Sequence, residues 1–146
     1  MSTVVVDASV VVKWVLEEPY STEAIALLNQ WAAQDHRILA PSLLAYEVTN
    51  ALYKRVVRGE LSLDEAQAAL ADVLSTGPEL ATNEAASPRA LELAHQFHRP
   101  SSYDAHYLAL AVWESCDFWT ADERLWNAVR ATLPWVHWIG EPRRQT

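Results

Sequence analysis

The sequence predicts an α/β fold in which helices cover both faces of a parallel sheet. Short apolar segments typical of buried strands alternate with longer segments of helical periodicity, beginning with residues 4–6 (VVV) and the helical segment 8–17. No sequence typical of a two-residue hairpin joins two of these strands, which favours βαβ units. Because the chain has 146 residues, we expect a single domain over residues 1–146.

Local sequence features predict where the remaining elements begin and end. We expect helices over 21–34, 42–58, 62–75, 84–98, 101–115 and 122–132, and strands over 37–40, 79–81, 117–120 and 135–139. Ser21 or Thr22 can cap the second helix, and Gly59 can end the third. Ser62 and Glu65 match the S-x-x-E capping box of the fourth.

Composition indicates an ordered protein outside the membrane. Hydrophobic residues make up 51% of the chain, and no apolar run reaches the roughly 20 residues of a membrane helix. The N-terminus has no basic stretch typical of a signal peptide, so we expect a cytoplasmic protein. Cys116 is the only cysteine, which excludes an intramolecular disulfide and favours a role in the core.

The net charge of −8 argues against a large basic surface for nucleic acid. A nuclease with this composition needs another source of positive charge near its substrate. Bound divalent cations would supply it, because they become the strongest local positive charges at a cluster of acids. The candidate site residues are therefore carboxylates that could share a cation.

Two aspartates follow predicted strands at the edge where parallel sheets bind ligands. Asp7 comes directly after the first strand, and Asp122 follows the strand over 117–120. Helix capping explains both equally well: Asp7 could be an N-cap, and Thr120 with Glu123 could form a capping box beside Asp122.

Two further acids lie in helices with strongly apolar faces. Glu47 falls within the apolar stripe of the helix over 42–58, where a charged group needs a partner or a metal unless it reaches solvent at the margin. Asp104 belongs to a helix that is apolar around most of its circumference. Ser101 and Asp104 also match a capping box, which needs no active site.

Together these acids suggest a site for Mg²⁺ or Mn²⁺. Hard cations take oxygen ligands, and crowded carboxylates repel one another unless a cation neutralises them. One or two such ions could activate water and stabilise phosphoryl oxygens during phosphodiester hydrolysis. We therefore expect metal-dependent hydrolysis at Asp7, Glu47, Asp104 and Asp122.

Four segments in order, VVVDASVVVKW, PSLLAYEVTNAL, SSYDAHYLALA and FWTADERLW, resemble the PIN domain family and particularly its VapC-type toxins. The resemblance spans residues 3–139 and implies three layers with sheet order 3-2-1-4-5. It implies an endoribonuclease in which the four acids bind Mg²⁺ or Mn²⁺ and catalyse hydrolysis, with Ser9 and Thr120 in support.

The same resemblance implies partners for the protein. They are an RNA substrate, a second copy of the chain and a cognate VapB-like antitoxin, whose arginine would suit a carboxylate cluster. The basic residues near the acids in sequence are candidates for RNA contact, although cations complementing a helix dipole explain them equally well: Lys13, Lys54, Arg55 and Arg58. Trp14 or Tyr20 could stack on a base, but core filling is the simpler interpretation.

Three other functions fit parts of the sequence. His95 and His98 form an H-x-x-H pair that could bind zinc, although no third ligand is evident nearby. Asp7 could be a phosphorylated nucleophile, but the segment lacks the second nearby aspartate that would hold magnesium beside it. A non-catalytic module could use the same acids only to bind RNA or an arginine-rich partner.

Overall fold

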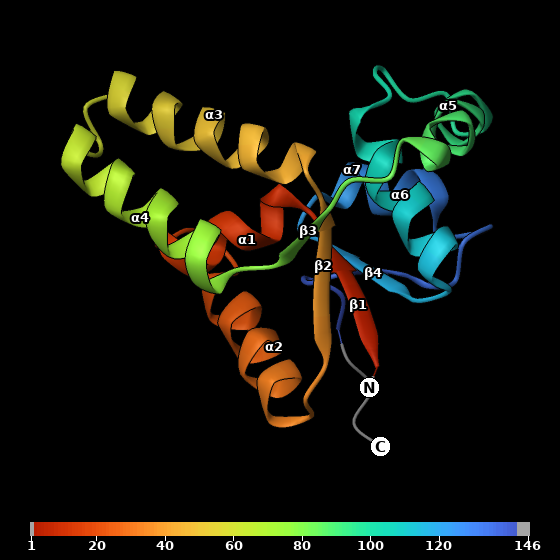
Figure 1. Cartoon of the computed structure of the whole chain (residues 1–146), viewed down its shortest axis with the longest axis horizontal. Helices are drawn as coiled ribbons and strands as arrows, with labels where there is room; N and C mark the ends of the chain where they lie inside the picture. The colour runs from red at the N-terminus through yellow and green to blue at the C-terminus, as the bar shows by residue number, and fades with distance from the viewer. Residues whose placement is uncertain (1, 143–146) are drawn as a thin grey trace.

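A five-stranded parallel sheet forms the centre of the part of the chain that the computed structural model describes, residues 2–142 (Figure 1). The strands are β1 (Thr3–Val6), β2 (Arg37–Pro41), β3 (Glu79–Ala81), β4 (Asp117–Thr120) and β5 (Val136–Trp138). Their order is β3-β2-β1-β4-β5, and each neighbouring pair is parallel. The predicted fold class and strand order are confirmed.

Helices cover both faces of this sheet. They are α1 (Ala8–Val15), α2 (Ser21–Ala33), α3 (Leu43–Val57), α4 (Leu63–Thr76), the 3-10 turn η1 (Glu84–Ala86), α5 (Ser87–Gln96), α6 (Tyr103–Glu114) and α7 (Glu123–Val129). Figure 1 shows α1 to α4 on one side of the sheet and α5 to α7 on the other. Right-handed crossovers require this division, because the chain moves outward from β1 to β3 and then returns to build β4 and β5.

Several predicted helix ends are confirmed. Ser62 Oγ accepts a hydrogen bond from the Glu65 backbone at 3.0 Å, and the Glu65 carboxylate accepts one from the Ser62 backbone at 3.0 Å, which completes the capping box. Gly59 follows α3 with a φ of 74°, a left-handed conformation that glycine adopts without steric cost. The loop between α3 and α4 is therefore encoded locally.

Other predicted helix ends are wrong. Tyr20 rather than Ser21 precedes α2, and the Ser21 hydroxyl donates to the Leu16 carbonyl at 2.9 Å instead of capping the helix. The helix predicted over 84–98 starts as η1 and ends at Gln96. His98 consequently lies beyond α5, in a left-handed conformation with a φ of 51°.

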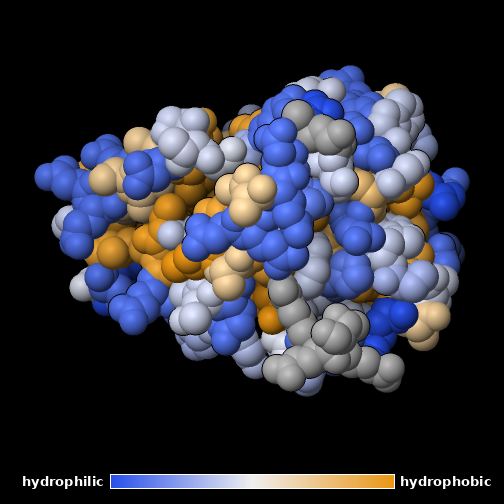
Figure 2. All heavy atoms as spheres, turned by 90° about the horizontal axis from the view of Figure 1, so that it is seen from below, coloured by the Kyte–Doolittle hydropathy of each residue, from blue (hydrophilic) through white to orange (hydrophobic). Residues whose placement is uncertain are grey.

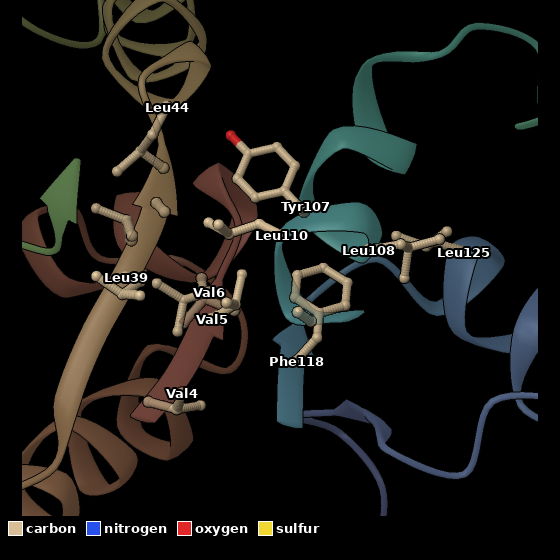
Figure 3. Close-up of a cluster of buried hydrophobic side chains, with 14 of the residues drawn as sticks. Val4, Val5, Val6, Leu39, Leu44, Tyr107, Leu108, Leu110, Phe118 and Leu125 are labelled. Atoms are coloured by element: carbon tan, nitrogen blue, oxygen red, sulfur yellow. The ribbon is translucent and has the colours of Figure 1, made fainter. Parts of the chain in front are cut away.

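Apolar side chains from the sheet and from α6 form the core beneath the site. Val5 and Val6 of β1 are fully buried, and Tyr107 of α6 stacks on Phe118 of β4 with ring centroids 6.1 Å apart (Figure 3). Strands β1 and β4 are neighbours at the point where the strand order reverses, and ligands bind beyond the carboxyl ends of such strands. Among residues 2–142, no helix is long and apolar enough to cross a membrane.

Candidate active site

Asp7 lies immediately beyond the carboxyl end of β1, where it caps α1. Its Oδ1 accepts a hydrogen bond from the Val10 backbone at 3.3 Å, so the capping interpretation is correct in geometry. The side chain is nonetheless buried, with only 8% of the residue exposed. Burial, opposed by hydrogen bonds and reinforced by the charge of Glu47, raises the pKa of Asp7 to about 6. An exposed helix cap would show no such shift.

Two hydroxyl groups hold the Asp7 carboxylate. Ser9 Oγ donates to Oδ1 at 2.5 Å, and Thr120 Oγ1 donates to Oδ2 at 2.6 Å. Each hydroxyl also accepts from the backbone at the start of the β4–α7 connection: Ala121 donates to Ser9 and Asp122 donates to Thr120. Ser9 and Thr120 therefore link the ends of β1 and β4 through Asp7.

Glu47 approaches Asp7 from α3. It is half-buried between the buried residues Leu44 and Val48, as its position in the apolar stripe predicted. Its Oε1 accepts a hydrogen bond from the hydroxyl of Tyr107, which is 1% exposed. Sequence reasoning missed Tyr107, although its spacing of three residues from Asp104 places both on one face of α6.

Asp104 lies at the start of α6. Its Oδ2 accepts a hydrogen bond from Arg99 Nε at 2.9 Å, and both side chains are largely buried. Its Oδ1 is buried and has no hydrogen-bond partner among the described residues. The alternative capping box with Ser101 is not observed, because α6 begins at Tyr103 and Ser102 occupies the N-cap position without a side-chain bond. Sequence reasoning also missed Arg99.

Asp122 caps α7 at the end of the β4 connection. Its Oδ1 accepts from the backbones of Arg124 at 3.0 Å and Leu125 at 3.2 Å. The alternative capping box of Thr120 with Glu123 is wrong, because Thr120 points towards Asp7. Asp122 is exposed, and it adjoins Asp7 through the Thr120 hydroxyl that its own backbone N–H binds.

Contacts at the carboxyl ends of β1 and β4 link Asp7 to Glu47 and, through Thr120, to Asp122, whereas Asp104 is connected to them only along α6. Asp7 and Glu47 are close enough for their charges to interact, and Asp104 is one helical turn from Tyr107, which binds Glu47. Across residues 2–142 no three His, Cys, Asp or Glu side chains converge as a group that could hold a metal ion. Each carboxylate is instead bonded to donors within the chain.

The donor chemistry of this edge nevertheless fits a hard divalent cation. Mg²⁺ and Mn²⁺ prefer carboxylate oxygens, and the four acids offer only oxygen ligands. The buried Oδ1 of Asp104 needs a partner, since a buried polar atom without one is costly. A cation would also favour the ionised form of Asp7, which burial disfavours.

Comparison with known families identifies the family of this chain. The family model described as PIN domain matches residues 4–131. The chain belongs to the PIN domain family. A crystal structure of PAE2754 from Pyrobaculum aerophilum has the same fold, with a TM-score of 0.66, 22% sequence identity, and coverage of 93% of this chain and 83% of that one.

Curated relatives of this PIN domain include Ribonuclease VapC1 of two Mycobacterium tuberculosis strains, CDC 1551 / Oshkosh and ATCC 25618 / H37Rv. Each is 42% identical over 88 residues, which is 59% of this chain. The match spans 63% of each relative's own length. The similarity to a VapC-type protein that the sequence suggested is therefore confirmed.

The predicted RNA-contacting residues of this PIN domain fall into different environments. Lys13 and Arg55 both bind Glu18, Lys13 at 3.1 Å, and Arg55 also pairs with Glu60 at 3.1 Å. Lys54 lines a pocket that also contains Glu47. Arg58 is exposed at the end of α3 and outside that pocket. Sequence reasoning missed Glu18, whose partner Arg55 is 37 residues away.

The zinc-binding and base-stacking interpretations gain no support from the described residues. His95 and His98 do not share a helix, and neither belongs to a group of metal ligands in residues 2–142. Trp14 donates its indole N–H to the Ala24 carbonyl at 2.9 Å and packs against Trp31, as core filling requires. Burial raises the pKa of the half-buried Cys116 thiol to about 11, which disfavours a reactive thiolate.

Proposed function

We propose that this PIN domain is a metal-dependent endoribonuclease that hydrolyses RNA phosphodiester bonds at Asp7, Glu47, Asp104 and Asp122. The observation that carries the proposal is the buried Asp7 carboxylate at the carboxyl ends of β1 and β4, with its pKa raised by burial and by Glu47. Perturbed carboxylates of this kind are typical of functional sites. The similarity to a protein named Ribonuclease VapC1 supports the same chemistry.

The four acids would hold one or two Mg²⁺ or Mn²⁺ ions. Bound ions of this kind supply a lowered pKa for attacking water and positive charge for the phosphoryl oxygens. Of the four acids, Asp7 and Asp104 are the strongest candidates for metal ligands. Asp7 needs a compensating positive charge, and one oxygen of Asp104 needs a partner. Asp122 and Glu47 would complete the set from α7 and α3.

The chain's own donors would orient these acids. Ser9 and Thr120 fix both oxygens of Asp7, so its carboxylate plane is set before any ligand arrives. Tyr107 fixes one oxygen of Glu47, and Arg99 fixes one oxygen of Asp104 while leaving the other available. Such preorganisation lowers the cost of arranging four like charges around one substrate.

We further propose that the enzyme is the toxin of a toxin–antitoxin pair, acting in the cytoplasm on cellular RNA. A VapB-like antitoxin would inhibit it by placing an arginine at the carboxylates, and the chain would form a homodimer. Figure 2 shows hydrophobic side chains gathered on the half of the molecule that carries α1 to α4. Exposed apolar residues of α3 and α4 that could contact such partners are Tyr46, Tyr53, Val57, Leu63 and Leu74.

Cleavage of labelled single-stranded RNA tests the proposal. Purified protein without a partner should cleave with Mg²⁺ or Mn²⁺ and should stop with EDTA. Asp104→Asn should lower the rate by at least about 100-fold, because the change removes a ligand's charge without removing its shape. Asp72→Asn is the matched control: Asp72 is exposed in α4, away from the site, and its loss should leave the rate unchanged.

A non-catalytic binding module is the second candidate, and the observation that favours it is that every site carboxylate already has a donor within the chain. Such a module would bind RNA or an arginine-rich partner equally well in EDTA and would never turn over. Absence of cleavage by folded, partner-free protein with either metal, across varied RNA, would favour the module over the nuclease.

A further inference from the structure

A pocket opens beside Glu47, between α1 and α3. Its volume is about 380 Å³, which is within the range of small-ligand sites. Side chains from both helices and from the loop after α1 supply its polar lining: Ser9, Lys13, Glu18, Glu47, Asn50 and Lys54. The pocket is therefore continuous with the acidic edge but differs from it in charge.

Helical spacing gives the pocket a direction. Glu47, Asn50 and Lys54 are three and four residues apart, so they lie along one face of α3. At a rise of 1.5 Å per residue, Lys54 lies about 10 Å beyond Glu47 along the helix axis. A ligand that reaches from the acids to Lys54 must therefore be larger than one phosphate group.

The far end of the pocket carries positive charge in a chain whose net charge is −8. Glu18 is held between two cations, because its Oε1 binds Lys13 at 3.1 Å and its Oε2 binds Arg55. The Glu18 backbone is fixed as well, donating to the Ser21 hydroxyl at 2.9 Å. Lys54 forms no ion pair with any residue in the range 2–142, so its ammonium group is available to an anion.

We propose that this pocket binds the nucleotide next to the phosphodiester bond that the acids hydrolyse. Lys54 contacts the flanking phosphate, and Asn50 forms hydrogen bonds with the base or ribose, since its amide offers both donors and an acceptor. Glu18 is a positioning residue that keeps Lys13 against the pocket wall. The inference rests on the proposed nuclease function and specifies how its substrate is held.

A single-stranded RNA fits these features better than a duplex or an acidic peptide. Unpaired bases expose edges that an amide such as Asn50 can reach, whereas a duplex hides them. The pocket has acids at one end and Lys54 at the other. This arrangement suits a polynucleotide, which can place one phosphate at the acids and the next one near Lys54. An acidic peptide would place carboxylates beside Glu47 without a phosphodiester bond for the acids to act on.

Binding of a labelled single-stranded RNA to Lys54→Met, measured by fluorescence anisotropy in the Asp104→Asn background, tests the subsite without interference from cleavage. We expect the Kd to rise about tenfold, because a charge-assisted contact is lost. The slope of log Kd against log salt concentration should fall by about 0.7, the value for one phosphate contact with a single strand. Arg89→Met on α5 removes an exposed cation outside the pocket and should change the Kd less than twofold.

Asn50→Ala tests the contact with the base. The variant should lose the wild type's preference among four RNAs that differ only in the nucleotide beside the cleaved bond, through an increase in KM and not through a decrease in kcat. Lys54→Gln provides a second neutral substitution, and circular dichroism with thermal unfolding checks that every variant folds. Lys54 is exposed, so its truncation leaves the core intact.

Failure of the subsite and failure of the nuclease give different results. Cleavage by the wild type with an unchanged KM and Kd in Lys54→Met would overturn the subsite and leave the nuclease standing. Lys54-dependent RNA binding without cleavage in Mg²⁺ or Mn²⁺ would overturn the nuclease, and with it the position of the subsite beside a cleaved bond, but would leave Lys54 as an RNA contact. The subsite would also be overturned if the protein bound no RNA, or if Lys54→Met weakened binding of a protein partner but not of RNA.

Discussion

At the scale of single residues, Asp7 combines two roles that usually occur in different environments. It caps α1, as aspartates at helix starts often do, but it is buried and bound by two hydroxyls and lies beside another carboxylate. A cap needs only a polar oxygen, whereas a buried ionised carboxylate destabilises the fold unless a positive charge compensates it. The ionised Asp7 side chain therefore places a negative charge at the sheet edge and lowers the stability of the fold.

The buried Asp7 carboxyl group predicts that the free energy of unfolding, measured in EDTA, depends on pH in an unusual way. The pKa of Asp7 is about 6 in the folded protein and near 3.8 when exposed, so the folded state binds the proton more tightly. The resulting stabilisation is complete below pH 4 and disappears as pH rises through 6, a loss of roughly 3 kcal/mol. Asp7→Asn should therefore increase in stability relative to wild type over this interval.

Urea unfolding at pH 4, 5, 6 and 7 measures the difference between wild type and Asp7→Asn. Other carboxylates titrate in the same range, and subtracting the two curves removes their contribution. Asp72→Asn, an exposed change in α4, should run parallel to wild type. A constant difference between wild type and Asp7→Asn at all four pH values would contradict the buried, raised carboxyl group.

At the scale of elements, the hydrogen bond between Tyr107 and Glu47 connects α6 and α3, which cover opposite faces of the sheet (Figures 1 and 3). Burial and the Glu47 carboxylate raise the pKa of Tyr107, so the phenol remains a donor at any working pH. The bond crosses the carboxyl edge beside Asp7. It is therefore a link between the two helical layers at the site itself.

Tyr107→Phe should weaken both this link and activity. The ring still stacks on Phe118, so the loss is confined to one bond to a charged acceptor, about 1.5–3 kcal/mol of unfolding free energy. Cleavage should fall about tenfold in kcat, since Glu47 loses the donor that orients it. Chemical unfolding and RNA cleavage measure the two effects.

Tyr103→Phe is the matched control for that substitution. Tyr103 also belongs to α6 and lies one turn before Tyr107, but its side chain is exposed. Its hydroxyl should be dispensable for stability and for cleavage. Equal behaviour of the two phenylalanine variants would show that the Glu47 contact does not orient the carboxylate.

For the whole molecule, the net charge of −8 and the proposed metal site predict that divalent cations stabilise the folded protein. A ligand that binds only the folded state stabilises it by mass action, by about 2.7 kcal/mol at 100 times its Kd. Mg²⁺ or Mn²⁺ at that level should raise the Tm of the wild type by roughly 5–10 °C. Asp104→Asn should lose most of this increase.

Thermal scans with and without the metal give the measurement, and isothermal titration gives the Kd that sets its concentration. Sodium chloride at matched ionic strength controls for screening of the surface charge. If sodium produced the same increase as Mg²⁺, or if Asp104→Asn responded like wild type, the cation would be acting on the surface and not at the proposed site.

Local patterns in the sequence are sufficient to predict the fold class and to place the acids along the chain. Alternation of apolar strands with helices requires a parallel sheet, and residues that follow β1 and β4 must emerge at its carboxyl edge. Glu47 could be singled out because a charge within an apolar helix stripe conflicts with burial. The Ser62 capping box and the turn at Gly59 were also predictable, since their interactions are confined to a few neighbouring residues.

The donors that bind those acids depend on how distant segments pack together. Tyr107 binds Glu47 over a separation of 60 residues, and Arg55 binds Glu18 over 37, so neither pairing leaves a local pattern. The predicted cap of α2 was wrong for the same reason. Ser21 bonds to the end of α1 and not to its own helix. Periodicity specifies which face of a helix is buried; the partner on that face depends on how the layers pack together.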